Sequence, residues 1–185
     1  SMRNTLDFFK IKNGELGAIN FNNMIPVTKN NYIEIDLYAD ALNKEEQKYQ
    51  KMLKEQLDKI MRPKAIAVVG ASTKDHTIGS DIMKRLKEYK FTGDIYPVNP
   101  KGGEIEGFKA YTNVKEIPGN VDLAIIVIAQ KFVLQAIDDC HEKGIKGICI
   151  ISAGFKESGA EGAAAEKELV AKLKEYGMRC VGPNC

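Results

Sequence analysis

The hydrophobic pattern of the sequence changes near residue 60. Beyond that point, short continuous apolar runs alternate with stretches in which apolar residues recur every three or four positions. A continuous run is typical of a strand buried on both faces, whereas the wider spacing is typical of an amphipathic helix. The pattern predicts strands at residues 65–69, 95–98, 121–128, 147–151 and 179–181, and helices at residues 78–89, 132–143 and 161–176. This alternation predicts an α/β fold with a doubly wound parallel sheet.

Two of these helices carry an apolar face that is visible in the sequence. We expect the first to bury Ile78, Ile82, Leu86 and Tyr89, and the last to bury Leu169, Val170 and Leu173. The glycine-rich residues 99–107, which follow the second strand, are predicted to form a loop.

The first 60 residues have another pattern. Residues 5–11 and 32–37 alternate apolar and polar side chains, as half-buried strands do, and Asn13-Gly14 is a hairpin-turn signal. From Asn43, which is suited to cap a helix, apolar residues return at helical spacing until Pro63. We therefore expect a small N-terminal β-hairpin-plus-helix extension before the main domain, with the division at 1–60 and 61–185.

Small, polar or proline residues follow every predicted strand of the main domain. The loops are residues 70–73, 99–101, 129–131, 152–155 and 182–184. In a doubly wound sheet, ligands bind in the crevice beyond the carboxyl ends of the strands. Gly70 follows the first strand, where a glycine permits a tight turn and the close approach of a phosphate. A valine at Gly70 should therefore abolish ligand binding and leave the fold intact.

The nucleotide fingerprint at the first two strand ends is incomplete for a dinucleotide. A Rossmann-like dehydrogenase domain carries Gly-x-Gly-x-x-Gly after its first strand and a carboxylate after its second, and this sequence shows neither. Asn99 is suited to reach a ribose, and Lys101 a phosphate on that ribose. Coenzyme A carries such a phosphate at the 3′ position and NADP at the 2′ position, so both ligands remain open at this point.

The five strand ends together resemble a known family. The motifs are Gly70-Ala-Ser72, Tyr96-Pro-Val-Asn-Pro-Lys101, the strand at 121–127, Ile151-Ser-Ala-Gly-Phe-Lys-Glu157 and Val181-Gly-Pro-Asn-Cys185. From residue 57 to residue 185 the sequence is similar to the coenzyme A-binding domain of the NDP-forming acyl-CoA synthetases, relatives of the succinyl-CoA synthetase α-subunit.

This resemblance implies coenzyme A as the ligand and assigns the site residues. The phosphate turn would be Gly70, Ala71, Ser72 and Thr73, and the Asn99-Pro100-Lys101 tip would bring Lys101 to a coenzyme A phosphate. Ile151, Ser152 and Ala153 would line the path of the pantetheine arm, and Asn184 would lie near the thiol end.

Family synthetases also use a phosphohistidine in a second flavodoxin-like domain and an ATP-grasp module. Neither His76 nor His141 stands at the position of that phosphohistidine, and both have the character of surface residues. We expect this chain to bind coenzyme A or acyl-CoA without turning it over, to carry no catalytic residue, and to depend on those two modules of a parent acid–CoA ligase. The resemblance leaves open whether the chain is truncated or a natural stand-alone domain.

A second resemblance concerns residues 4–60, and above all Ile19-Asn-Phe-Asn-Asn-Met-Ile-Pro-Val27. This stretch is similar to the C-terminal half of the type III toxin endoribonucleases, the ToxN/AbiQ-like family. That family's catalytic residues lie mostly in a half that is missing here, so we expect an appendage that packs on the main domain or a partner. The alternative functions are a toxin–antitoxin-like protein that binds RNA or a partner, and an NADP-binding oxidoreductase domain.

Composition and charge limit the classes of function that the protein can have. The net charge of +2 gives no argument for nucleic acid, and no apolar run approaches the roughly 20 residues of a membrane helix. No basic-then-apolar leader opens the sequence, so we expect a cytoplasmic protein. The four cysteines have no common zinc spacing, which predicts no metal site, and Cys149 lies in an apolar run typical of a buried reduced thiol.

Overall fold

The computed structural model describes residues 29–185, with side chains from residue 43 onward. The chain divides into two compact units, Ser1–Gln50 and Lys51–Cys185. The predicted strand at residues 5–11 and its hairpin turn lie outside the described residues.

Helix α2, Lys29–Met61, is longer than the sequence pattern predicts. The prediction of a strand at residues 32–37 is wrong, because this segment is helical. Its apolar residues alternate over a short window, but Ile33, Leu37 and Ala41 also recur every four positions, which is helical spacing. Asn43, expected to cap the helix, lies within it, and the helix ends two residues before Pro63, as expected from the missing N–H of proline.

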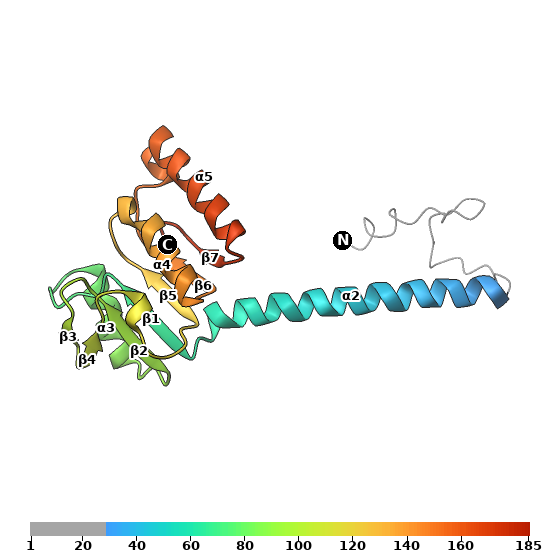
Figure 1. Cartoon of the computed structure of the whole chain (residues 1–185), viewed down its shortest axis with the longest axis horizontal. Helices are drawn as coiled ribbons and strands as arrows, with labels where there is room; N and C mark the ends of the chain where they lie inside the picture. The colour runs from blue at the N-terminus through green and yellow to red at the C-terminus, as the bar shows by residue number, and fades with distance from the viewer. Residues whose placement is uncertain (1–28) are drawn as a thin grey trace. The chain divides into compact units, whose positions relative to one another are not determined.

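The second unit is built on a five-stranded sheet in the order β2-β1-β5-β6-β7, and every neighbouring pair is parallel (Figure 1). The strands are β1 (Ala65–Val69), β2 (Asp94–Val98), β5 (Leu123–Ile126), β6 (Gly147–Ile150) and β7 (Arg179–Val181). Val69 pairs with both Val98 and Ile126, so the first three strands end at the same level of the sheet. The predicted α/β fold with a Rossmann-like parallel sheet is confirmed.

Helices cover both faces of the sheet (Figure 1). They are α3 (Ile78–Glu88), α4 (Val133–Lys143) and α5 (Ala160–Glu175), with single 3₁₀ turns η1 (Val114–Glu116), η2 (Gln130–Phe132) and η3 (Lys156–Ser158). Alternate residues of β1 belong to two separate cores, as the period of a strand requires. Ile66 and Val68 pack in the core that contains Met83 of α3, whereas Ala67 and Val69 pack in the core that contains α4 and α5 residues.

The buried face of α3 differs from the prediction. Ile78 and Tyr89 are 56% and 74% exposed, while Met83 is fully buried beside the half-buried Ile82 and Leu86. Gly79 in the first turn of α3 lies against the turn after β1, where a side chain would strike the carbonyl oxygen of Gly70. Met83, four residues further along, therefore faces the core.

Two smaller expectations are also wrong. Val170 of α5 is 41% exposed, although Leu169 and Leu173 are buried as predicted. The stretch at 99–107 that was predicted to be a loop contains strand β3 (Gly103–Ile105), which forms an antiparallel hairpin with β4 (Phe108–Ala110) directly after it. The three-residue strands are too short to show a pattern in a glycine-rich sequence. Of the helices in the described part of the chain, none has the length and apolar character to cross a membrane.

Candidate functional site

The turn after β1 is fixed by contacts within the protein. Gly70 has a φ of +96° and its N–H donates to the carbonyl oxygen of Val98, at 3.0 Å. A Cβ at this position would lie 2.3 Å from the carbonyl oxygen of Val127. The expectation that a valine at Gly70 would leave the fold intact is therefore wrong, because the glycine is required by the neighbouring strand ends whether or not a ligand is bound.

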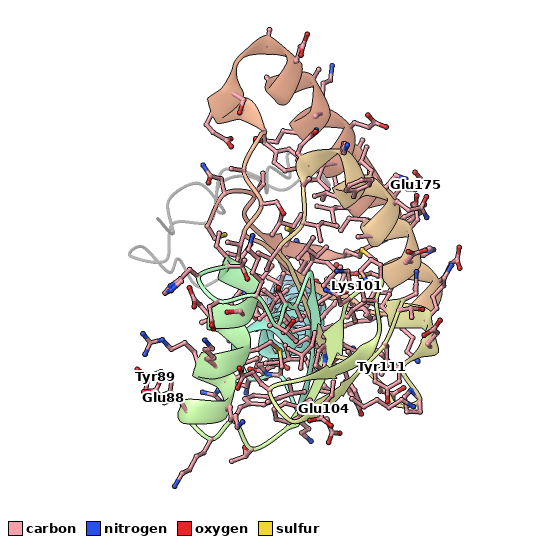
Figure 2. All side chains as sticks on the ribbon, turned by 90° about the vertical axis from the view of Figure 1, so that its left-hand side faces the viewer. Glu88, Tyr89, Lys101, Glu104, Tyr111 and Glu175 are labelled. Atoms are coloured by element: carbon pink, nitrogen blue, oxygen red, sulfur yellow. The ribbon has the colours of Figure 1, made fainter. Side chains whose placement is uncertain are left out.

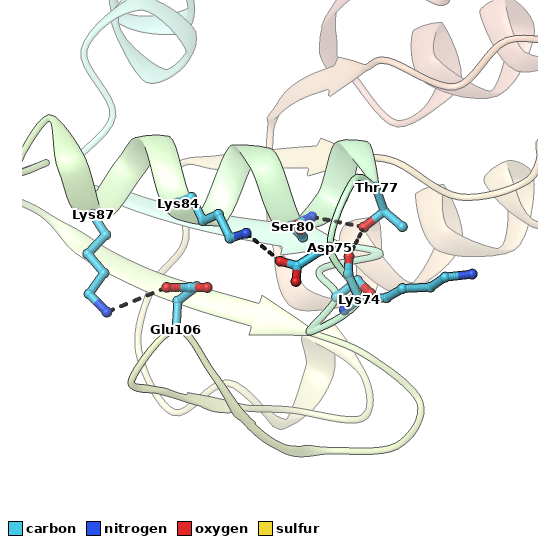
Figure 3. Close-up of polar contacts among 8 residues, drawn as sticks. Lys74, Asp75, Thr77, Ser80, Lys84, Lys87 and Glu106 are labelled. Atoms are coloured by element: carbon cyan, nitrogen blue, oxygen red, sulfur yellow. Dashed lines mark hydrogen bonds and ion pairs between the residues drawn. The ribbon is translucent and has the colours of Figure 1, made fainter.

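The N-terminus of α3 is pressed against this turn. A Cβ at Gly79 would lie 2.0 Å from the carbonyl oxygen of Gly70, so both glycines serve the same close contact. Thr77 caps the helix: its hydroxyl accepts from the N–H of Ser80 at 3.3 Å and donates to the carbonyl oxygen of Lys74 at 2.9 Å (Figure 3). The positive end of the helix dipole is thus held beside residues 70–73, which favours an anion there.

An ion pair joins the loop before α3 to the helix, and the first turn of α3 carries a hydroxyl without a hydrogen-bond partner among the described residues. Lys84 binds Asp75 at 2.6 Å, and this hydrogen bond and the lysine charge lower the pKa of the Asp75 carboxyl (Figure 3). Ser72 accepts from the N–H of Lys74 at 3.0 Å, while Thr73 and His76 are exposed. The hydroxyl of Ser80 is buried without a hydrogen-bond partner among the described residues.

The tip of β2 is tied to the same turn through Asn99. Its amide nitrogen donates to the carbonyl oxygen of Ala71 at 2.7 Å, and its amide oxygen accepts from the N–H of Lys101 at 2.9 Å. Lys101 is exposed (Figure 2), and its ammonium group makes no ion pair with any residue of the described chain. The amide of Asn99 thus fixes the backbone, while the charge of Lys101 stays available.

The ends of β5, β6 and β7 meet at Ser152. Its buried hydroxyl accepts from the N–H of Ile128 at 3.1 Å and donates to the carbonyl oxygen of Ile126 at 3.4 Å. The N–H of Asn184 donates to the Ser152 carbonyl oxygen at 3.2 Å, so the C-terminal loop lies against the end of β6. Ile151 is half-buried, and its backbone N–H donates to the carbonyl oxygen of Ile126 at 3.0 Å. Ala153 is exposed.

A carboxylate organises the loop after β6. Glu157 accepts from the N–H of Gly154 at 2.7 Å and from the N–H of Phe155 at 3.2 Å. These backbone hydrogen bonds, that from Gly154 first, lower the pKa of the Glu157 carboxyl. The loop that begins at Ala153 is therefore shaped by an ionised side chain.

A pocket of about 290 Å³ opens between the tips of β1 and β2 and the beginning of α4. Gly70 and Pro100, both predicted site residues, line it. The other lining residues are Val69, Val98, Thr112, Asn113, Val114, Ile128, Phe132, Gln135, Ala136 and Asp139. Sequence reasoning identified the loop at 129–131 as a strand end but missed the residues of η1 and α4 beside it. The available signal was that α4 starts directly after this loop, so its first turns had to border the same crevice.

The thiols are not arranged as a metal centre. Of the residues described, no group of three or more His, Cys, Asp or Glu side chains could hold a metal ion. All four cysteines are free; Cys149 is half-buried rather than buried, and desolvation raises its pKa to about 11. Cys140 is fully buried, and desolvation raises its pKa to about 12. These thiols are therefore neutral near pH 7.

The structure thus brings the predicted residues to one edge of the sheet in two groups. Gly70, Ala71, Asn99 and Ser152 hold the strand ends together, whereas Thr73, Lys101 and Ala153 are exposed around them. A doubly wound sheet with an anion-favouring turn, an exposed cation and an adjoining pocket defines a domain of the nucleotide-binding class.

Comparison with known proteins defines this class further. The family model of the CoA binding domain matches residues 64–185. The α-subunit of ADP-forming acetate–CoA ligase II from Pyrococcus furiosus is 54% identical over 129 residues, which are 70% of this chain and 28% of the relative. The model of Toxin ToxN, type III toxin-antitoxin system, matches residues 1–99. The chain therefore belongs to the CoA binding domain family, and its first 99 residues also fall within the toxin ToxN family.

Solved structures agree on the fold. The dinucleotide-forming acetyl-coenzyme A synthetase 1 of Ca. Korarchaeum cryptofilum, in complex with phosphate and ADP, aligns with a TM-score of 0.67 at 44% identity and covers 69% of this chain and 27% of that one. A protein from Pyrococcus horikoshii OT3 aligns with a TM-score of 0.67 at 53% identity, covering 70% and 29%. The chain spans less than a third of the length of these relatives.

Both resemblances stated from the sequence are confirmed, and the two family matches overlap at residues 64–99. In the structure the overlapping segment forms β1, α3 and β2, which are the first strand–helix–strand unit of the parallel sheet. Residues 64–99 are therefore matched by both family models and form part of the parallel sheet.

Proposed function

We propose that this chain binds coenzyme A at the carboxyl edge of its sheet and serves as the CoA-binding module of an NDP-forming acid–CoA ligase. The observation that carries the proposal is that Asn99 joins the β1 turn to the backbone of Lys101. Lys101 is an exposed cation without an ion-pair partner among the described residues. A nucleotide with a phosphate on its ribose matches this arrangement, and a plain dinucleotide does not.

The proposed pose follows the strand ends. The pyrophosphate lies at Gly70–Thr73, where the N-terminus of α3 favours negative charge. The ribose 3′-phosphate meets Lys101, and the adenine enters the pocket next to Pro100. The pantetheine arm then passes residues 151–153 toward Asn184, which is held at the end of β6.

In this proposal coenzyme A is a substrate that the chain positions. No side chain of the module forms or breaks a covalent bond, and the module fixes the thiol where an acyl group can be transferred to it. The phosphohistidine and the nucleotide-binding chemistry come from a second flavodoxin-like domain and an ATP-grasp module, the proposed partners. The division at residue 60 and the cytoplasmic location remain parts of the proposal.

The test is calorimetric titration of the whole chain with coenzyme A, dephospho-coenzyme A and NADPH. We expect a Kd on the order of micromolar for coenzyme A, a weaker Kd for dephospho-coenzyme A and no heat with NADPH. Absence of coenzyme A binding would overturn the proposal for this chain. Binding of NADPH in preference to coenzyme A would instead support the oxidoreductase alternative.

A second candidate function rests on the ToxN match over residues 1–99. In this alternative the N-terminal segment contacts RNA or a protein partner, and coenzyme A binding is a separate property of the sheet. Titration of the whole chain with a fluorescent single-stranded RNA, with and without saturating coenzyme A, tests it. Salt-sensitive RNA binding that coenzyme A leaves unchanged would support it, and no binding would remove it.

A further inference from the structure

The pocket beside Gly70 has one charged wall. Asp139 lies in α4 with its side chain only 13% exposed, and it is the single ionisable residue of the pocket lining. Its carboxylate oxygens accept from the amide nitrogen of Asn113 at 2.8 Å, from that of Gln135 at 3.3 Å, and from the ammonium of Lys115 at 3.1 Å. The carboxylate is thus held in one orientation from three sides.

Most of the remaining lining is apolar. The other polar lining residues are Thr112, whose hydroxyl donates to Glu116, and Asn113 and Gln135, whose amide nitrogens donate to Asp139. Apolar side chains come from β1, β2 and its end, η1, the β5 end, η2 and α4: Val69, Val98, Pro100, Val114, Ile128, Phe132 and Ala136. The volume of about 290 Å³ is at the low end of the roughly 300–1,000 Å³ typical of small-molecule pockets, so it suits one flat ring system. Such a pocket binds the faces of any purine without distinguishing one from another.

The hydrogen-bonding capacity of Asp139 does distinguish them. An ionised carboxylate only accepts, and it has about four acceptor positions, of which three are occupied here. A ligand edge with an N–H donor completes the set, whereas a carbonyl oxygen at the same place is repelled. Adenine presents an amino group at its 6-position, and guanine and hypoxanthine present a carbonyl oxygen there.

We infer that Asp139 is the residue that selects the base, through a hydrogen bond from the 6-amino group of adenine to its carboxylate. This inference rests on the proposed coenzyme A function. Asn113, Gln135 and Lys115 act through Asp139 and are positioning residues. Asp139 contributes specificity for the adenine end of the ligand and takes no part in chemistry at the thiol.

The experiment compares coenzyme A with an analogue in which purine replaces adenine, so that the amino group is lost and the ring shape is kept. For the wild-type chain we expect the analogue to bind about tenfold more weakly, as for the loss of one hydrogen bond to a charged group. In Asp139→Ala the two ligands should bind within about twofold of each other.

Glu142→Gln is the matched control. Glu142 also pairs with Lys115, at 3.1 Å, and lies on the same helix one turn further on, but it is not part of the pocket lining. This variant should keep the tenfold preference, and far-ultraviolet circular dichroism and thermal unfolding should report the fold of both variants.

The outcomes separate the two levels of the proposal. If the wild-type chain binds coenzyme A and the purine analogue equally, the role of Asp139 is overturned while the proposed function stands. If Asp139→Ala still prefers coenzyme A to the purine analogue, the role of Asp139 is likewise overturned while the proposed function stands. If the wild-type chain binds neither ligand, both proposals fall. The wild-type comparison needs no substitution, so a variant that does not fold leaves a decisive measurement in place.

Discussion

The tips of β1 and β2 are neighbours in the sheet, but their residues differ in how far the fold itself requires them. At the β1 tip, Gly70 is confined by the backbone of Val127 and by Gly79 in the first turn of α3. At the β2 tip, the amide of Asn99 serves the fold, whereas the charge of Lys101 serves no contact in the described chain. The difference teaches that a glycine in a phosphate-binding turn, such as Gly70, can be required by the fold alone and is then no evidence for a ligand. The side chain of Lys101, which the fold does not use, is the better test of ligand binding.

The strongest way to break this comparison is Gly70→Val. The substitution places a branched side chain at a φ of +96° and within 2.3 Å of the Val127 carbonyl oxygen. We expect a loss of about 4 kcal/mol or more in the free energy of unfolding, or failure to fold, measured by urea denaturation.

The control is Gly107→Ala, where φ is +89° but no atom lies within 4 Å of the added Cβ. Only the conformational strain remains there, and we expect a cost of about 1 kcal/mol. Equal losses at both positions would show that backbone strain, and not the contact with Val127, explains the glycine.

Asn99→Ala should have an intermediate effect on both properties. It removes the hydrogen bonds to the Ala71 carbonyl and the Lys101 N–H, so the two tips lose their link. We expect about 1–3 kcal/mol lower stability by urea denaturation and a weaker coenzyme A Kd by calorimetry. Asn120→Ala, at an exposed asparagine far from the strand tips, should change stability by less than about 0.5 kcal/mol. A stable Asn99→Ala chain would show that the tips need no such link.

Lys101→Ala sharpens the comparison because it should spare the fold. We expect stability within about 0.5 kcal/mol of wild type, since the exposed ammonium makes no ion pair with described residues. The coenzyme A affinity should fall by about two- to fivefold, as for a solvent-exposed charge pair, and the dephospho-coenzyme A affinity should stay unchanged.

The charge-matched control for this lysine is Lys174→Ala in the exposed last turn of α5. It removes the same charge from a helix that does not border the tips of β1 and β2, and it should leave both affinities unchanged. If Lys101→Ala weakened the two ligands equally, its contact with the 3′-phosphate would be excluded.

The smallest effect concerns the loop after β6 and is a pH dependence. The folded state lowers the pKa of Glu157, so the ionised carboxylate contributes stability above the ordinary pKa of the group, and this contribution is lost as pH falls through the lowered value. We expect urea denaturation between pH 6 and pH 3 to show a shallower loss of stability for Glu157→Gln than for wild type. Identical slopes would mean that the loop keeps its shape without the charge.

The sequence predicted the sheet because each strand is a continuous apolar run with a breaker after it. Ile66 to Val69 before Gly70 show this pattern most clearly, and β1 has the predicted bounds. The rotation of α3 was not predictable in the same way, since it depends on contact between Gly79 and Gly70, nine positions apart in the sequence. The helix at residues 32–37 was missed because alternation over six residues satisfies both periods.

The site was predicted at the level of strand ends and not at the level of the pocket. Topology places the carboxyl ends of parallel strands together, so Gly70, Lys101 and Ser152 could be assigned to one edge from sequence order alone. Asp139 could not, because its burial and its contacts with Asn113 and Lys115 depend on how α4 packs beside η1. Tertiary packing of this kind leaves no local signature.

The hydrogen bond from Asn99 to the Ala71 carbonyl has a dynamic consequence. It joins the loop after β1 to the loop after β2, so local opening of one loop requires the other to open as well. The amides of Gly70 and Gly102, which donate to the carbonyl oxygens of Val98 and Asn99, would then exchange their hydrogens through a common opening with one opening free energy. A nucleotide that spans both loops would slow the two amides together, because the chain presents them to the ligand as one cooperative unit.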